Sequence, residues 1–92
     1  MDLSLTDFEA FVGDAHELVF ADATIPIVLE KAQALPRSMR DAGAFRLEWR
    51  GPGEPVLPQA TYRFRRGEQT FDMFIVPVGR DSSGTLYEAI FN

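Results

Sequence analysis

The residues of this chain best suited to chemistry are its single histidine and a neighbouring pair of serines. His16 is the side chain that titrates near neutral pH without help, and a catalytic triad would join it to a serine nucleophile and an orienting acid. Ser82 and Ser83 are the candidate nucleophiles, but they lie in an Asp-Ser-Ser-Gly turn without a strand-to-helix elbow. A surface or strand-end histidine is the simpler interpretation, so a hydrolase is the last of three functional hypotheses.

Carboxylates, metal ligands and phosphate-binding loops offer no better site. Asp72 could be a buried acid, yet an outward aspartate paired with Arg63 or Arg65 on a neighbouring strand explains it more simply. The chain has no cysteine, and the turn at 81–84 lacks the further acids that a calcium loop needs. It also contains neither a P-loop nor a GxGxxG motif. We therefore expect no enzyme activity, no cofactor and no metal.

Length and charge limit the possible partners. The 92 residues are enough for one domain, residues 1–92, and 46% of them are hydrophobic, as in globular proteins. The net charge of -5 repels nucleic acid and anionic membranes. No apolar run is long enough to span a bilayer, and no basic segment precedes an apolar one at the N-terminus. The sequence predicts a cytoplasmic protein that binds neither nucleic acid nor membrane.

A short helix should open the chain. In the string LTDFEAFVG, Thr6 can cap the first backbone amides, Glu9 can reach back to the cap, and Gly13 can end the helix. The apolar residues of this segment recur at helical spacing over about two turns. A helix this short is unstable alone in water, so we expect it to dock on the rest of the domain.

Alternating apolar and polar residues predict six strands after Gly13. Glycine, proline and aspartate clusters separate the strands, as in an antiparallel meander. Pro26 cannot donate to a ladder, so it should lie at an edge or a bulge. The expected fold is mainly β: a small antiparallel β-barrel or strongly curved sheet of about six strands with one short N-terminal helix. The expected strands are Ala15–Phe20, Thr24–Leu35, Ala44–Arg50, Ala60–Arg66, Thr70–Val78 and Thr85–Phe91.

The last two strands are apolar on both faces, which is the main functional signal. Phe74 and Val76 lie on the second face of one strand, and Leu86 and Ile90 lie on that of the other. One face can cover the core, whereas the other needs the helix, a second copy or a partner protein. The leading hypothesis is therefore a non-enzymatic protein-interaction or assembly protein that uses this hairpin.

Arginines on the third and fourth strands are a second candidate surface. Their side chains should point outward, and if these strands are neighbours they share one face that could meet an acidic partner. A solvated face laced with Glu48 and Asp72 is the simpler interpretation. The arginines concerned are Arg46, Arg50, Arg63 and Arg65.

Aromatic residues on the middle strands leave one further alternative. Trp49 and Tyr62 could line the mouth of a barrel that carries a small ligand or a peptide. A barrel of six strands has little room inside, so most of the aromatic residues should fill the core.

Five strings in fixed order carry a family resemblance. LTDFEAFVG is followed by Arg50–Pro52 (RGP), Leu57–Phe64 (LPQATYRF), Phe71–Gly79 (FDMFIVPVG) and Tyr87–Asn92 (YEAIFN). This pattern resembles a family of short bacterial proteins known only as a domain of unknown function. This family looks like a companion of proteins with phage-tail collar domains, whose genes often lie nearby. The resemblance implies an accessory of phage-tail-like or surface-fibre structures, with a collar-domain tail-fibre protein as partner, and it supplies no catalytic residues.

Overall fold

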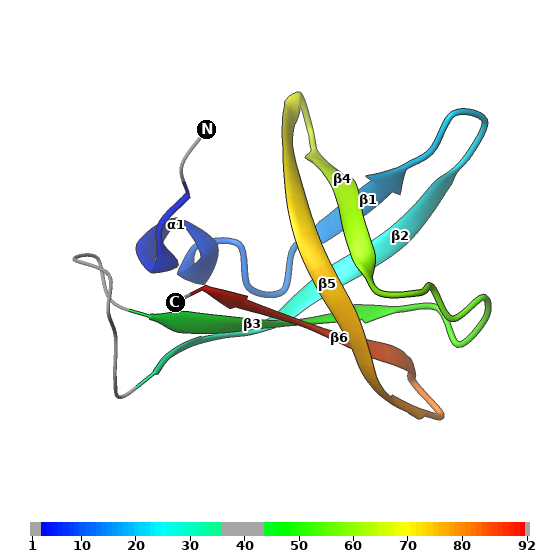
Figure 1. Cartoon of the computed structure of the whole chain (residues 1–92). Coiled ribbons are helices and arrows are strands. Elements are labelled where there is room, and N and C mark those ends of the chain that lie inside the picture. Colours follow the sequence, from blue (N-terminus) through cyan, green and yellow to red (C-terminus); the bar gives the residue numbers. More distant parts are fainter. Residues whose placement is uncertain (1–2, 36–43, 92) are drawn as a thin grey trace.

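The computed structural model describes residues 3–35 and 44–91. The predicted fold class, a mainly β antiparallel barrel with one short N-terminal helix, is confirmed for this part of the chain (Figure 1). The segment that was expected to interrupt the strand order, residues 36–43, lies outside the described residues. The elements are α1 (Leu5–Glu9), β1 (Ala15–Val19), β2 (Thr24–Ala34), β3 (Phe45–Gly51), β4 (Ala60–Arg66), β5 (Gln69–Asp81) and β6 (Gly84–Phe91).

The strands form one closed ring in the order β1-β2-β3-β6-β5-β4, with every neighbouring pair antiparallel. Closure depends on two long strands. β2 pairs with β1 over residues 24–28 and with β3 over residues 28–34. β5 pairs with β4 over residues 69–75 and with β6 over residues 76–81, and Figure 1 shows it as a long strand, yellow to orange. Pro26 lies in the half of β2 that pairs only with β1, the edge position that its missing N–H predicts.

Alternate residues of the strands fill the barrel. In β3, Phe45, Leu47 and Trp49 are buried while the charged residues between them reach solvent, as the sequence predicts. Phe64 links this row to β5, because its ring centroid lies 4.6 Å from that of Trp49 and 5.4 Å from that of Phe71. The other large buried hydrophobic side chains are Phe8, Leu18, Ile27, Leu29, Met73, Ile75 and Tyr87.

The cap of α1 differs from the prediction. The N-cap is Ser4, whose Oγ accepts a hydrogen bond from the Asp7 N–H at 3.3 Å, while the Asp7 carboxylate accepts one from the Ser4 N–H at 2.8 Å. The predicted box of Thr6 and Glu9 was wrong, because Ser4 and Asp7 have the same three-residue spacing and start the helix two residues earlier.

The helix docks through one aromatic ring. Phe8 is 1% exposed, and its ring centroid lies 5.8 Å from that of Phe71 and 6.1 Å from those of Phe45 and Phe91. These partners come from β5, β3 and β6, so Phe8 fills one end of the barrel; Figure 1 shows α1 beside the ends of β3 and β6. A helix of five residues has little stability of its own, and this packing is what holds it.

The fifth strand is longer than predicted. The prediction ended it at Val78, because Gly79 was taken as the start of a loop, but β5 continues to Asp81. The register shifts between Pro77 and Gly79, and the extra residue in this bulge lets the strand keep pairing with β6. The other strand boundaries differ from the predicted ones by one residue at most. The β5–β6 connection is therefore a tight turn at Ser82 and Ser83.

Candidate functional site

An apolar surface covers the outside of β5 and β6. We call Phe74, Val76, Val78, Leu86 and Ile90 the outer β5–β6 face, because all five alternate with residues that point into the barrel. Phe74 is 53% exposed, Val78 50% and Ile90 46%. Val76 and Leu86 are half-buried. Of the five large hydrophobic residues that are exposed in the described chain, three lie on this face.

The described chain covers this surface only in part, because about half of Phe74, Val78 and Ile90 stays exposed. The inward residues of β5, Phe71, Met73 and Ile75, are buried at 8%, 5% and 0% exposure, so the core draws on the other face of the strand. The buried side chain of α1, Phe8, packs into the barrel end and not onto the outer face. Of the four hairpin residues named from the sequence, Phe74 and Ile90 are exposed, whereas Val76 and Leu86 are half-buried.

A network of one arginine and two glutamates interrupts the outer β5–β6 face. Glu88 lies between Leu86 and Ile90, and its carboxylate accepts a hydrogen bond from Arg46 Nε at 2.7 Å. Arg46 Nη2 also donates to Glu48 at 2.9 Å. The hydrogen bonds to Glu88 and then to Glu48 raise the pKa of Arg46, so its guanidinium stays charged.

A second arginine borders the same face. Arg50 donates from Nε to Glu30 at 2.9 Å and from Nη1 to Asp81 at 2.6 Å. The Ser83 N–H donates to the Asp81 carboxylate at 2.8 Å, and this bond and then the one from Arg50 lower the pKa of Asp81. The rim of the outer β5–β6 face thus consists of hydrogen-bonded ion pairs on β2, β3 and the β5–β6 turn.

The four candidate arginines do not form one open cationic face. β3 and β4 are separated in the ring by β6 and β5, so the condition that these strands be neighbours is not met. On β4, Arg63 pairs with Asp72 at 3.1 Å and Arg65 pairs with Glu17 at 2.9 Å. The exposed Asp72 is therefore an ion-pair partner, as the simpler interpretation predicted.

His16 is a core residue of β1, which corrects the expected surface or strand-end position. It is 1% exposed, and its Nδ1 donates to the Asp14 carbonyl at 3.0 Å. Burial is the main cause that lowers the pKa of His16. Ser82 and Ser83 are exposed at the β5–β6 turn, so the structure does not bring the proposed base and nucleophiles together. His16 alternates along the strand with the apolar residues Leu18 and Phe20, so these three side chains point to the same face. This alternation is the sequence signal that places His16 inside the barrel.

Trp49 and Tyr62 do not meet at a barrel mouth. Trp49 is 0% exposed, and its ring centroid lies 4.9 Å from that of His16. Tyr62 is half-buried on β4, where it packs against Phe20 and donates from its hydroxyl to the Pro58 carbonyl at 2.6 Å. A ligand would reach Tyr62 without touching Trp49.

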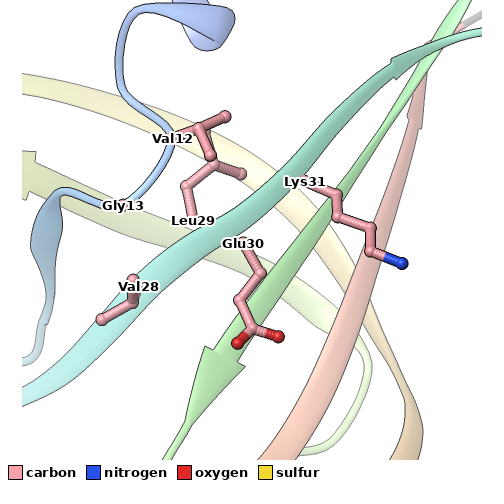
Figure 2. A pocket seen from close by; sticks show the side chains of 6 residues that line it. All are labelled: Val12, Gly13, Val28, Leu29, Glu30 and Lys31. Atoms are coloured by element: carbon pink, nitrogen blue, oxygen red, sulfur yellow. The ribbon is translucent and has the colours of Figure 1, made fainter.

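The structure contains a shallow groove that the sequence analysis missed. It measures about 390 Å³ and lies where the turn after α1 meets the middle of β2 (Figure 2). Val12 and Gly13 line it from the turn, and residues 28–31 line it from β2. The ladder to β3 shifts register between Leu29 and Lys31, so β2 has a bulge at this point. No glycine or proline marks this bulge, so the sequence predicts a strand over residues 24–35 without an interruption there.

Two features are absent from residues 3–35 and 44–91. No three side chains of the metal-ligating types lie together in these ranges. No helix there is long and apolar enough to cross a membrane.

Comparison with known proteins gives one match. The family described as a domain of unknown function, DUF6916, matches residues 3–91. No curated protein and no solved structure matches the chain.

Proposed function

We propose that this chain, which belongs to the DUF6916 family, is a non-enzymatic protein-interaction or assembly protein. The family has no known function, so the proposal rests on the surface of the chain itself. The observation that carries this proposal is the outer β5–β6 face, where Phe74, Val78 and Ile90 are about half exposed. Scattered apolar residues are normal on protein surfaces, but here Val78 lies within the paired part of the β5–β6 hairpin, and Phe74 and Ile90 lie just beyond the end of that ladder, opposite Thr61 of β4 and Arg46 of β3.

The composition of the face supports a docking role. An aromatic side chain among aliphatic ones, bordered by ion pairs, is the usual arrangement of an interface core and its polar rim. Arg46 bonds to both Glu88 and Glu48, so this network keeps one excess negative charge, which a basic group of the partner would offset on covering it. Completing the burial of Phe74 would contribute on the order of 1 kcal/mol, because half of the side chain is already covered.

The occupant that we propose is a different protein, with an apolar patch and a neutral or basic surround. The chain has a net charge of -5, so two copies repel each other while a less acidic partner is attracted. A collar-domain protein of a phage-tail-like or surface-fibre structure is the partner that the family resemblance implies. The interaction is taken to occur in the cytoplasm, during assembly.

The test is binding to a purified collar-domain protein from the same genome, measured by isothermal titration calorimetry. The double variant Phe74→Ser, Ile90→Ser should bind on the order of 10-fold to 100-fold more weakly than the wild type. The matched control is Val56→Ser, since Val56 is 45% exposed but lies in the β3–β4 loop, away from the face. Control and wild type should bind equally.

Three outcomes would overturn the proposal. The first is no binding by the wild type, and the second is a double variant that binds as tightly as the wild type. The third is a dimer in analytical ultracentrifugation that the double variant abolishes, which would assign the face to a second copy. The alternative of a small-ligand or peptide carrier stays a prediction, and the enclosure of Trp49 adds nothing in its favour.

A further inference from the structure

Within residues 3–35 and 44–91, the second half of β2 has a strand partner on one side only. Residues 28–34 pair with β3, whereas the pairing with β1 ends at Val28. Past that point, the Gly13 N–H donates to the Leu29 carbonyl at 2.8 Å, and this is the last backbone bond on that side in the described chain. We call the remaining stretch, residues 30–34 on the side away from β3, the open edge of β2.

The direction of the backbone groups on this edge follows from one hydrogen bond. The Leu35 N–H donates to the Ala44 carbonyl at 2.9 Å, so the backbone groups of Leu35 face β3. Successive residues of a strand direct these groups to opposite sides. The N–H and C=O groups of Ala32 and Ala34 therefore point away from β3, along the open edge, where unpaired groups favour the addition of another strand.

The groove and one cation lie at the start of this edge. Val12, 43% exposed, lines the groove beside Leu29, and Figure 2 shows Lys31 extending away from Val12. Lys31 is the cation without a carboxylate partner among the described residues, because the arginines there all form ion pairs. Those arginines are Arg46, Arg50, Arg63, Arg65, Arg66 and Arg80.

From these observations we infer that an extended peptide segment of another protein binds as an added strand along the open edge of β2, with an acidic side chain opposite Lys31. Backbone bonds to Ala32 and Ala34 supply the affinity, and Lys31 supplies the preference for a carboxylate. A second copy of the chain is a poorer occupant, since it would place Lys31 near its own counterpart and bring together two net charges of -5. β3 separates this edge from β6, so the site is independent of the outer β5–β6 face.

The ladder geometry predicts which amides of the peptide are needed. The peptide residue opposite Lys31 directs its own N–H away from β2, because Lys31 directs its backbone groups toward β3. The residues on either side of it direct their N–H groups toward β2. In the probe acetyl-Thr-Val-Glu-Val-Thr-amide, placed antiparallel with its glutamate opposite Lys31, the first valine lies opposite Ala32 and its amide bonds to the edge. The acetyl carbonyl accepts from the Ala34 N–H, and the glutamate amide makes no bond to the edge.

The experiment is an NMR titration of the full-length ¹⁵N-labelled chain with this probe. Hydrogen exchange of the Ala32 and Ala34 amides should slow on binding. A probe N-methylated at both valines should lose binding, whereas a probe N-methylated at the glutamate should keep it. Lys31→Glu should weaken binding about 3-fold to 10-fold, and Lys31→Arg, which keeps the charge, should bind like the wild type.

Four results would overturn the inference. The first is that exchange of the Ala32 and Ala34 amides stays unchanged at several millimolar probe, and the second is that the two methylation patterns have equal effects. The third is that Lys31→Glu binds the probe as tightly as the wild type does. The fourth is that exchange of these amides slows when the protein concentration alone is raised. The last result would assign the edge to a second copy.

Discussion

Acidification below pH 6.5 should destabilise this protein, because its one histidine is held neutral in the core. The Nδ1 of His16 donates to the Asp14 carbonyl, and its Nε2 is buried without a hydrogen-bond partner among the described residues. Burial lowers the pKa of His16, and the nearby charge of Arg66 acts in the same direction, against the hydrogen bond to Asp14. The unfolded chain takes up this proton near pH 6.5, while the folded chain does so only at lower pH. Stability is therefore complete well above pH 6.5 and falls as the pH drops below it.

The loss of stability is set by the one proton that His16 binds in the unfolded chain but not in the folded chain. Between pH 7.5 and 5.5 the free energy of unfolding should fall by up to about 1.4 kcal/mol. The carboxylates affect stability in a lower pH range. Hydrogen bonds from Arg65 lower the pKa of Glu17, and the hydrogen bond from the Ser83 N–H lowers the pKa of Asp81. A lowered acid pKa contributes stability above its unfolded value, which is lost only below about pH 4.5. The interval from 7.5 to 5.5 therefore reports on the histidine.

Urea unfolding followed by the fluorescence of Trp49 measures this loss, since the indole is 0% exposed in the folded state. The wild-type midpoint should fall by about 1 M urea between the two pH values. His16→Leu puts an apolar side chain of similar size at this position, and leucine cannot titrate. The urea midpoint of this variant should therefore differ little between pH 7.5 and 5.5. The reasoning fails if the wild-type midpoint does not move, or if His16→Leu loses as much stability as the wild type.

Two further predictions concern backbone and core. Gly84 has a φ of +129°, and a Cβ there would collide with the Gly51 carbonyl oxygen, so Gly84→Ala should cost more than about 2 kcal/mol in urea unfolding. The matched control Gly67→Ala, at a φ of +61° in open space, should cost about 1 kcal/mol, and equal losses would contradict the steric argument. Phe8→Ala should cost about 3–5 kcal/mol by emptying the barrel end. A change below about 1 kcal/mol would show that α1 does not support the barrel.

Alternation predicted the strands whose two faces differ in polarity. In β3, charged residues separate Phe45, Leu47 and Trp49, so only one register buries the apolar set. The order of strands in the ring could not be read in the same way. It depends on β2 and β5 each changing partner halfway along, and no residue type marks where a strand changes its neighbour.

The candidate site was partly visible in the sequence for the same reason. Phe74, Val76, Leu86 and Ile90 were predicted to be outward because their strands are apolar at both parities, and the structure leaves Phe74 and Ile90 exposed. The open edge of β2 was not predicted. A missing neighbour is a property of the assembled sheet and leaves no trace in the local pattern.

The seam between β1 and β4 is the shortest in the ring. β1 and β4 share three residue pairs, Glu17 with Arg65, Leu18 with Phe64 and Val19 with Arg63, whereas β3 and β6 share seven. Local opening of the barrel should therefore begin between β1 and β4. The opened state would be a curved sheet with β1 and β4 as its edge strands. Deuterium should then enter the amides of this seam before those between β3 and β6.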